Sequence, residues 1–244
     1  MKSKIALVDW DNTLRRGFTL LDWVDWLTDR GQFPGHVTRE LHDLMGAYWS
    51  GVLPYGEFAT SMTDGYARGL AGQRVDAIEE SAIHFAHLDN HRLYSFAPRL
   101  FKILQSCQID VVVVSGCPIE PLKAYQAYLN MSEIYGLAMQ VTAGRYLPNP
   151  ELNPAGYDGK KMIVGKLDSE SLSIALAIGD STADIPLLDA AEYRIVVDNP
   201  TLLPAGPTVL HISSEPGEAD FERMVRFIGR AQLGDHRDGP GDYG

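Results

Sequence analysis

Short apolar runs separated by amphipathic stretches dominate the pattern of hydrophobic and polar positions along the chain. Aliphatic runs typical of strands buried on both faces occupy 5–8, 109–114, 174–178, 193–197 and 208–212. The spacing of apolar residues predicts helices over 97–107, 118–129, 159–168 and 185–191. Strands that alternate with helices indicate right-handed βαβ units, so we expect an α/β fold with a doubly wound parallel sheet of the Rossmann type.

One long interval interrupts this alternation. Between about residues 19 and 91 no strand pattern appears, and apolar periodicity predicts helices over 20–28, 36–48, 55–65 and 76–87. We therefore expect a helical cap domain at 19–91, inserted after the first strand of a core formed by 1–18 and 92–232. Such a cap would lie over the carboxyl ends of the strands, where the sites of these sheets are found.

Two further segments are irregular in pattern. We expect a small β excursion over 138–146, followed by a loop rich in Pro and Asn over 147–154. The polar, Gly-rich tail 233–244 has little apolar surface to bury, and we expect it to be disordered.

Polar residues follow three of the predicted strands and begin one predicted helix. In chain order they are Asp9, Asp11 and Thr13, then Ser115 and Gly116, then Lys160 and Lys161, and finally Asp180 and Asp184. Because the carboxyl ends of parallel strands meet at one edge of a sheet, these groups should converge. Two carboxylates held as close as Asp9 and Asp11 repel unless a cation or a shared proton intervenes, which favours a metal site.

Phosphoryl transfer requires groups of this kind. It needs an in-line nucleophile, positive charge around the equatorial oxygens and a proton for the leaving alkoxide. Asp9 can attack phosphorus to form an aspartyl-phosphate, and Asp11 can protonate the leaving oxygen and later deprotonate the attacking water. Mg²⁺ suits a site that combines a few carboxylates with substrate oxygens and waters.

The order and context of the motifs DxDxT, Ser-Gly, Lys and GDxxxD resemble the haloacid dehalogenase (HAD) superfamily of phosphatases. The likeness covers 1–18 and about 92–212, and a helical insertion between the first two motifs resembles the phosphoserine phosphatase-like class. It implies a Mg²⁺-dependent phosphomonoester hydrolase that uses an aspartyl-phosphate intermediate.

The resemblance also implies a role for each motif residue. The catalytic pair would be Asp9 and Asp11, and the metal ligands would be the Asp9 carboxylate, the Asp11 backbone carbonyl and Asp180, with Asp184 as a ligand or as an acceptor behind the ligands. Substrate binding would fall to Thr13, Ser115, Gly116 and Lys160. Lys161 is the alternative to Lys160, because the predicted start of the helix is uncertain by a residue.

Two departures from the phosphoserine phosphatase pattern argue against phosphoserine itself. The glutamate usual in the first cap helix is missing, since no acid occurs between Asp11 and Asp22, and Ser-Gly-Cys-Pro replaces Ser-Gly-Gly-Phe at 115–118. A small phosphomonoester remains the expected substrate. Aromatic residues of the cap region would suit a less polar leaving group, although two tryptophans among them also fit a buried helix stripe. They are Phe18, Trp23, Trp26, Tyr48 and Trp49.

Other functions fit the motifs less well. A dehalogenase would need neither Asp11 nor the downstream acids, because halide leaves without a proton. A phosphotransferase could pass the same aspartyl-phosphate to another acceptor, and a regulatory phosphate-binding protein could keep the fold without turnover.

Composition narrows the classes of partner. The 244 residues carry a net charge of -11, which argues against nucleic acid. No apolar run reaches about 18 residues and no secretory signal precedes the first strand, so we expect a cytoplasmic protein without a membrane partner. Cys107 and Cys117 fit free thiols, in a helix end and a loop, and Arg15 and Arg16 fit hinge or surface charges. The sequence leaves the oligomeric state open.

Overall fold

A seven-stranded sheet forms the centre of the protein, whose computed structural model describes residues 3–169 and 172–233. The strand order is β4-β3-β2-β1-β5-β6-β7. The strands are β1 (Lys4–Val8), β2 (Ile109–Pro118), β3 (Glu133–Thr142), β4 (Arg145–Leu152), β5 (Ser173–Gly179), β6 (Tyr193–Val197) and β7 (Val209–Ile212). The described strands pair in parallel except for β4, which runs antiparallel to β3 at one edge.

The order of the strands reverses at β1. From β1 the chain first builds the sheet outward through β2 and β3, and then returns to add β5, β6 and β7 on the other side. This is the doubly wound arrangement expected from the sequence. In such sheets a ligand site lies at the carboxyl ends of the strands on either side of the reversal.

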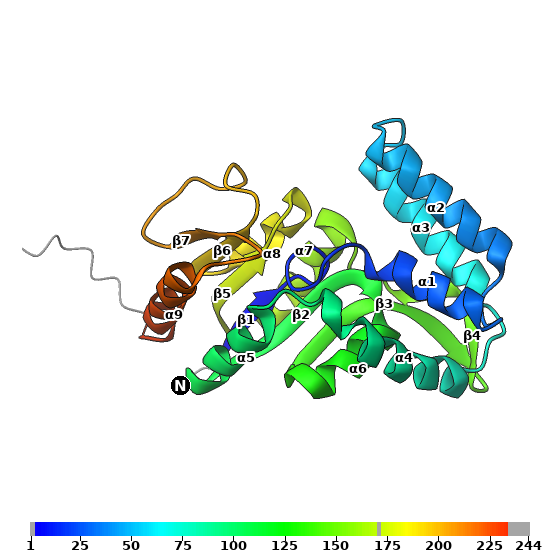
Figure 1. Cartoon of the computed structure of the whole chain (residues 1–244), viewed down its shortest axis with the longest axis horizontal. Helices are drawn as coiled ribbons and strands as arrows, with labels where there is room; N and C mark the ends of the chain where they lie inside the picture. The colour runs from blue at the N-terminus through cyan, green and yellow to red at the C-terminus, as the bar shows by residue number, and fades with distance from the viewer. Residues whose placement is uncertain (1–2, 170–171, 234–244) are drawn as a thin grey trace, which may run out of the picture.

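Helices connect the strands and form the insertion (Figure 1). The α-helices are α1 (Thr19–Asp29), α2 (Gly35–Trp49), α3 (Tyr55–Leu70), α4 (Val75–Asp89), α5 (Ala97–Ser106), α6 (Ile119–Leu129), α7 (Gly156–Ser169), α8 (Ile185–Ala190) and α9 (Glu218–Leu233). Two short 3-10 helices are η1 (Asn90–Arg92) and η2 (Thr182–Asp184). The helices α1 to α4 all come between β1 and β2, as the resemblance implied.

Alternate side chains of β1 enter two separate cores, because successive residues of a strand point to opposite faces. Ala6 and Val8 pack with residues of α5, α6 and α9. Ile5 and Leu7 pack with residues of α7 and α8. Both faces of the sheet are therefore covered, which explains the unbroken apolar runs of its inner strands.

The inserted helices share a third core with the β3–β4 hairpin. The stripe predicted for the first inserted helix packs on this core: Trp23 and Leu27 are fully buried in it, and Trp26 is partly buried against it. The hairpin contributes Leu137, Met139 and Tyr146 to the same core. Figure 1 places α1 to α4 and this hairpin at one end of the molecule and α9 at the other.

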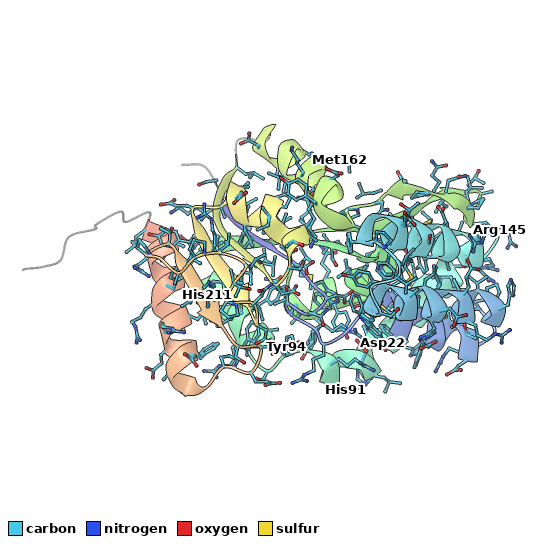
Figure 2. All side chains as sticks on the ribbon, turned by 90° about the horizontal axis from the view of Figure 1, so that it is seen from above. Asp22, His91, Tyr94, Arg145, Met162 and His211 are labelled. Atoms are coloured by element: carbon cyan, nitrogen blue, oxygen red, sulfur yellow. The ribbon has the colours of Figure 1, made fainter. Side chains whose placement is uncertain are left out.

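Backbone hydrogen bonds join the loop between α3 and α4 to the hairpin. Gly72 N donates to Tyr146 O at 2.9 Å, Tyr146 N donates to Gln73 O at 3.1 Å, and Val75 N donates to Gly144 O at 3.0 Å. Arg145 lies at this end of the molecule (Figure 2) and its guanidinium donates to Gly72 O. The insertion is thus attached to the sheet far from its two covalent connections.

The structure corrects several predictions of local structure. The segment predicted as a loop over 147–154 belongs mostly to β4, because proline is tolerated on the edge strand of a sheet. The predicted excursion begins earlier, since β3 starts at Glu133 and pairs with β2. Cys117 lies in β2 rather than in a loop, and α7 begins at Gly156 rather than at residue 159.

The end of the chain contains a helix that the apolar pattern did not identify. It is α9, whose buried residues include Phe221, Met224 and Phe227. The predicted disordered tail 233–244 lies outside the described residues except for Leu233, which is the last residue of α9. Within 3–169 and 172–233, no helix is both long and apolar enough to cross a bilayer.

Candidate active site

The loop that follows β1 places the first acidic pair at the reversal of strand order. Asp9 N donates to Ile178 O of β5 at 3.0 Å, which continues the sheet by one residue. The carbonyl of Trp10 then accepts the backbone N–H groups of Thr13, Leu14 and Arg15, so the chain turns tightly after Asp11. Asn12 takes the left-handed conformation at φ 60°, which asparagine tolerates better than most residues.

Lys160 joins two of the predicted site residues. Its ammonium donates to Asp9 Oδ1 at 2.7 Å and to Asp184 Oδ1, and all three side chains are buried. Lys160 lies on α7, where it is only 4% exposed. Lys161, the alternative, is exposed and points toward Tyr157, so the geometry brings Lys160 and not Lys161 to the acids.

The segment after β5 holds the second acidic pair in place. Asp184 Oδ2 accepts from Asp180 N at 3.1 Å and from Ser181 N at 2.9 Å, and the Ser181 hydroxyl donates to it as well. Asn199 Nδ2 donates to Asp180 O at 2.9 Å. A side chain at Gly179 would collide with Asp184, since an added Cβ would lie 2.5 Å from Asp184 Cβ.

Thr13 links the two acidic pairs. Its hydroxyl lies 2.8 Å from Asp180 Oδ1 and 3.4 Å from Asp9 Oδ2. Thr13 is fully buried, so this polar group is satisfied inside the protein. In this structure it contacts the acids rather than open space, and its predicted role in substrate binding stays a prediction.

Asp11 stands apart from the other acids. Its carboxylate accepts the backbone N–H of Thr19, at 3.0 Å to Oδ1 and 3.1 Å to Oδ2, and also accepts from the Thr19 hydroxyl. Burial raises the pKa of Asp11 to about 7, although the charge of Arg15 and the bonds from Thr19 lower it. A carboxyl group that titrates near neutral pH can both give and take a proton under physiological conditions.

The end of β2 carries the Ser-Gly motif beside the loop after β1. Val113 of β2 pairs with Val8 of β1. Asp9 directly follows Val8 and Ser115 comes shortly after Val113, so both lie at the same edge on neighbouring strands. Ser115 is 2% exposed, and its Oγ accepts from Cys117 N at 3.3 Å. A Cβ on Gly116 would lie 2.8 Å from Ala155 Cβ, so glycine permits the segment before α7 to approach.

A family model for haloacid dehalogenase-like hydrolases matches residues 6–189, about three quarters of the chain. The chain belongs to the haloacid dehalogenase-like hydrolases. The match includes all the motif residues described above and the helical insertion. No curated protein sequence matches the chain.

Several solved structures resemble this HAD-like hydrolase. A protein of unknown function from Bordetella pertussis Tohama I is 21% identical, with a TM-score of 0.69 over 82% of this chain and 92% of that one. A phosphoserine phosphatase solved as an analogue of its phospho-aspartyl intermediate is 17% identical, with a TM-score of 0.62 over 92% and 99%. The phosphoserine phosphatase from T. onnurineus is 19% identical, with a TM-score of 0.56 over 94% and 95%. At these identities the likeness is one of fold.

The acids of this HAD-like hydrolase fit a divalent cation. One ligand atom each of Asp9, Asp180 and Asp184 lies within 4.8 Å of the other two. Burial, together with the neighbouring carboxylates, raises the pKa of Asp9 to about 6 and that of Asp180 to about 8. Burial lowers the pKa of Lys160, but the carboxylates of Asp184 and Asp9 outweigh it and raise that pKa above its ordinary value. One ammonium among three carboxylates leaves excess negative charge, which a hard cation with oxygen ligands would offset.

Arg15 corrects the interpretation of the arginine pair as hinge or surface charges. Its side chain is fully buried, and its guanidinium donates twice to Asp89, from Nε and Nη2, at 2.6 Å each. Nη2 also donates to Asp22 Oδ2 at 2.7 Å. Asp22 lies in the first inserted helix, and Asp89 is the last residue of the fourth (Figure 2 labels Asp22). Arg15 therefore joins both ends of the insertion to the loop after β1. Arg16 is exposed and pairs with Glu215, as a surface charge would.

Sequence reasoning missed three residues that support the site. Thr19 holds Asp11, Ser181 holds Asp184, and Asn199 holds the backbone of Asp180. Ser181 caps a helix, a position that hydroxyl residues favour, whereas Thr19 is the first residue of α1, after its N-cap Phe18. The capping preference could have identified Ser181 as structural but not as a partner of the acids. No local signal points to Asn199, which comes from the loop after β6.

Proposed function

We propose that this HAD-like hydrolase is a Mg²⁺-dependent phosphomonoester hydrolase that acts on a small molecule through an aspartyl-phosphate. The observation that carries the proposal is a group of four side chains: Asp9 after β1, Asp180 and Asp184 after β5, and Lys160 from α7. Asp9, Asp184 and Lys160 are buried, Asp180 is partly buried, and Asp11 lies close by but is held separately. Together these residues supply a nucleophile, a cation, a metal site and a proton carrier, as phosphoryl transfer requires.

Asp9 is the nucleophile in this proposal. Its Oδ1 is held by Lys160 at 2.7 Å, which leaves Oδ2 to attack phosphorus. The bond between phosphorus and the leaving oxygen breaks as the bond to Asp9 forms. Lys160, which lies on α7, neutralises the Asp9 carboxylate and binds a phosphate oxygen through its positive charge.

Asp11 carries the proton. With a pKa raised to about 7 by burial, it gives a proton to the leaving oxygen in the first step and takes one from water in the second. That water attacks phosphorus, releases phosphate and restores Asp9. The bonds from Thr19 hold the Asp11 carboxylate in one orientation throughout.

Binding of the phosphate group completes the assignment. Ser115 and the N–H of Gly116 lie at the end of β2, next to the strand that carries Asp9, and would donate to phosphate oxygens. Mg²⁺ held by Asp9, the Asp11 carbonyl, Asp180 and Asp184 would neutralise charge on phosphate and nucleophile when bound. We assign the cap role to residues 19–91, which would exclude bulk water from the bound ester.

Phosphate release from a panel of phosphomonoesters tests the proposal. The wild type, Asp9→Asn and the control Asp189→Asn, an exposed acid on α8, would each be assayed with and without Mg²⁺. We expect metal-dependent release by the wild type and the control and none by Asp9→Asn. Release by Asp9→Asn would exclude the aspartyl-phosphate route. A folded, metal-replete wild type that labels Asp9 but releases phosphate only when an acceptor alcohol is present would instead be a phosphotransferase.

A further inference from the structure

Four aromatic residues of the insertion, together with Phe18 just before it, form two adjacent groups of contacting rings near the candidate site. The aromatic cluster consists of Phe18, Tyr48, Trp49, Tyr55 and Phe58. Tyr48 stacks on Phe58 with 4.4 Å between ring centroids, and Tyr55 lies 5.9 Å from Tyr48. Phe18 lies 6.2 Å from Trp49, the chain neighbour of Tyr48. Four of the five come from the end of α2 and the start of α3.

Tyr55 brings the aromatic cluster to the helix that carries Lys160. A Cβ added to Gly156 would lie 3.0 Å from Tyr55 Cε1 and 3.6 Å from the Tyr55 hydroxyl oxygen. Gly156 begins α7 with φ +71°, one turn before Lys160, so the ring rests against the first turn of that helix. Burial raises the pKa of the Tyr55 hydroxyl, and the charges of Lys160, Asp9 and Asp184 act on it as well. Tyr55 therefore lies against the start of the helix that carries Lys160 and remains 41% exposed.

Phe18 is the chain neighbour of the residue that holds the proton carrier. It precedes Thr19, whose N–H and hydroxyl both donate to Asp11. The leaving group of an ester attacked by Asp9 must lie near Asp11, because Asp11 protonates the leaving oxygen in the proposed reaction. An aromatic residue thus precedes the residue that holds Asp11, and a second one, Tyr55, lies against the first turn of the helix that carries Lys160.

The charge of this region narrows the class of leaving group. Between residues 46 and 67 the sequence contains no Lys, Arg or His, but it contains Glu57 and Asp64. The next cation, Arg68, is paired with Glu40 at 2.6 Å. Beside Phe18, Arg16 pairs with Glu215, and Arg92 pairs with Asp22 at 3.2 Å. A leaving group with its own carboxylate, such as that of phosphoserine, would therefore meet aromatic faces, acids and cations that already have partners.

We propose that the aromatic cluster holds the leaving group, with Tyr55 as the specificity-determining contact, and that the substrates are phosphomonoesters of flat, uncharged alcohols. Aryl phosphates are the simplest members of that class. This inference rests on the proposed function, since it concerns the leaving group of the same reaction. The ring of Tyr55 packs on the face of the aryl group, as aromatic pairs do.

The first test compares two esters in three forms of the protein. We would measure kcat/KM for phenyl phosphate and for phosphoserine in the wild type, in Tyr55→Ala and in Tyr128→Ala, an exposed tyrosine on α6 that serves as the matched control. For each protein we take the ratio of kcat/KM for phenyl phosphate to kcat/KM for phosphoserine. Comparing this ratio between proteins cancels the different intrinsic reactivities of the two esters. We expect Tyr55→Ala to lower the ratio of phenyl phosphate to phosphoserine about tenfold, a typical worth of an aromatic contact. Tyr128→Ala should keep the wild-type ratio.

A second test uses the unmodified protein and needs no turnover. Calorimetric titration with phenylphosphonate and with methylphosphonate compares an aromatic with a small apolar group on the same anion, and we expect phenylphosphonate to bind about tenfold more tightly. Equal binding of the two phosphonates, or an unchanged ester ratio in Tyr55→Ala, would overturn the inference while the hydrolase proposal stands. Failure of the wild type to hydrolyse any ester would instead overturn the proposed function, and the phosphonate comparison would still decide the aromatic contact.

Discussion

Replacing Arg15 by methionine should be among the most destabilising single changes at the base of the insertion. The change keeps an apolar stem and removes a guanidinium that is fully buried between Asp89 and Asp22. Within the part of the chain that the structure describes, Asp89, which is 6% exposed, would keep as side-chain partners the Tyr125 hydroxyl at 2.7 Å and the longer pair with Arg92 at 3.6 Å. Removing one partner of a buried ion pair costs about 3–5 kcal/mol. At about 2–4 °C per kcal/mol for a protein of this size, the midpoint of thermal unfolding should fall by roughly 6–20 °C.

The neighbouring arginine provides a matched control for Arg15→Met. Arg16→Met removes the same charge one residue later, from a pair whose side chains are about half exposed, 46% for Arg16 and 52% for Glu215. Exposed pairs contribute about 0–1 kcal/mol, so its midpoint should move by only a few degrees. Thermal unfolding followed by circular dichroism at pH 7 measures both variants. Equal midpoints for Arg15→Met and Arg16→Met would refute the burial argument.

A double variant separates the charge from the packing. Asp89→Asn in the Arg15→Met background removes the carboxylate that the first change leaves buried. Residues that share one ion pair are coupled by about 0.5–3 kcal/mol, so the double variant should be more stable than Arg15→Met alone. A double variant that unfolds at an even lower temperature, by the full sum of both changes, would mean that the two side chains act independently.

Three further predictions concern the site and its surroundings. Thr19→Val removes the hydroxyl bond to Asp11 but keeps the N–H bonds, so kcat should fall about tenfold in a steady-state assay; an unchanged kcat would mean that the backbone alone positions Asp11. Mg²⁺ should raise the midpoint of thermal unfolding of the wild type, and raise it less in Asp180→Asn, because the cation offsets the carboxylates within 4.8 Å; equal shifts would place the ion elsewhere. Burial raises the pKa of Glu120, a buried residue of α6, above its ordinary value of 4.5. The stability that Glu120 contributes is therefore complete below pH 4.5 and is lost as pH rises through the folded pKa. The free energy of unfolding, measured with urea, should therefore fall less between pH 5 and pH 8 in Glu120→Gln than in the wild type. Equal decreases in the two proteins would show that Glu120 does not cause this pH dependence.

The sheet and the position of the site could be predicted from the sequence because both depend on local patterns. Aliphatic runs mark the inner strands wherever the sheet is covered on both faces, and polar groups after those runs mark the edge where they meet. The convergence of Asp9 with Asp180 and Asp184 follows from that single rule, whereas Lys160 reaches the same edge from helix α7.

The errors occur where a distant partner overrides a local preference. The prolines at 148 and 150 favour a loop, but β4 is an edge strand and can accommodate them. Arg15 is a charged residue beside a glycine-containing turn, which favours exposure; its partners Asp22 and Asp89 come from two ends of an insertion whose packing the sequence pattern does not specify. Tyr55 is likewise an ordinary first residue of a helix, and its contact with Gly156, which places it against the start of α7, joins segments far apart in the sequence.

The shared core of the insertion and the β3–β4 hairpin limits how this HAD-like protein can be re-engineered or can diverge. A chimera that exchanges only residues 19–91 for the cap of a relative would leave Leu137, Met139 and Tyr146 without their cover and would break the backbone bonds at Gly72 and Val75. A transplantable unit must include the hairpin as well, although more than 40 residues separate it from the insertion in sequence. Changes of cap length among natural relatives should accordingly be accompanied by changes in the hairpin, so that the two segments are inherited as one unit of variation.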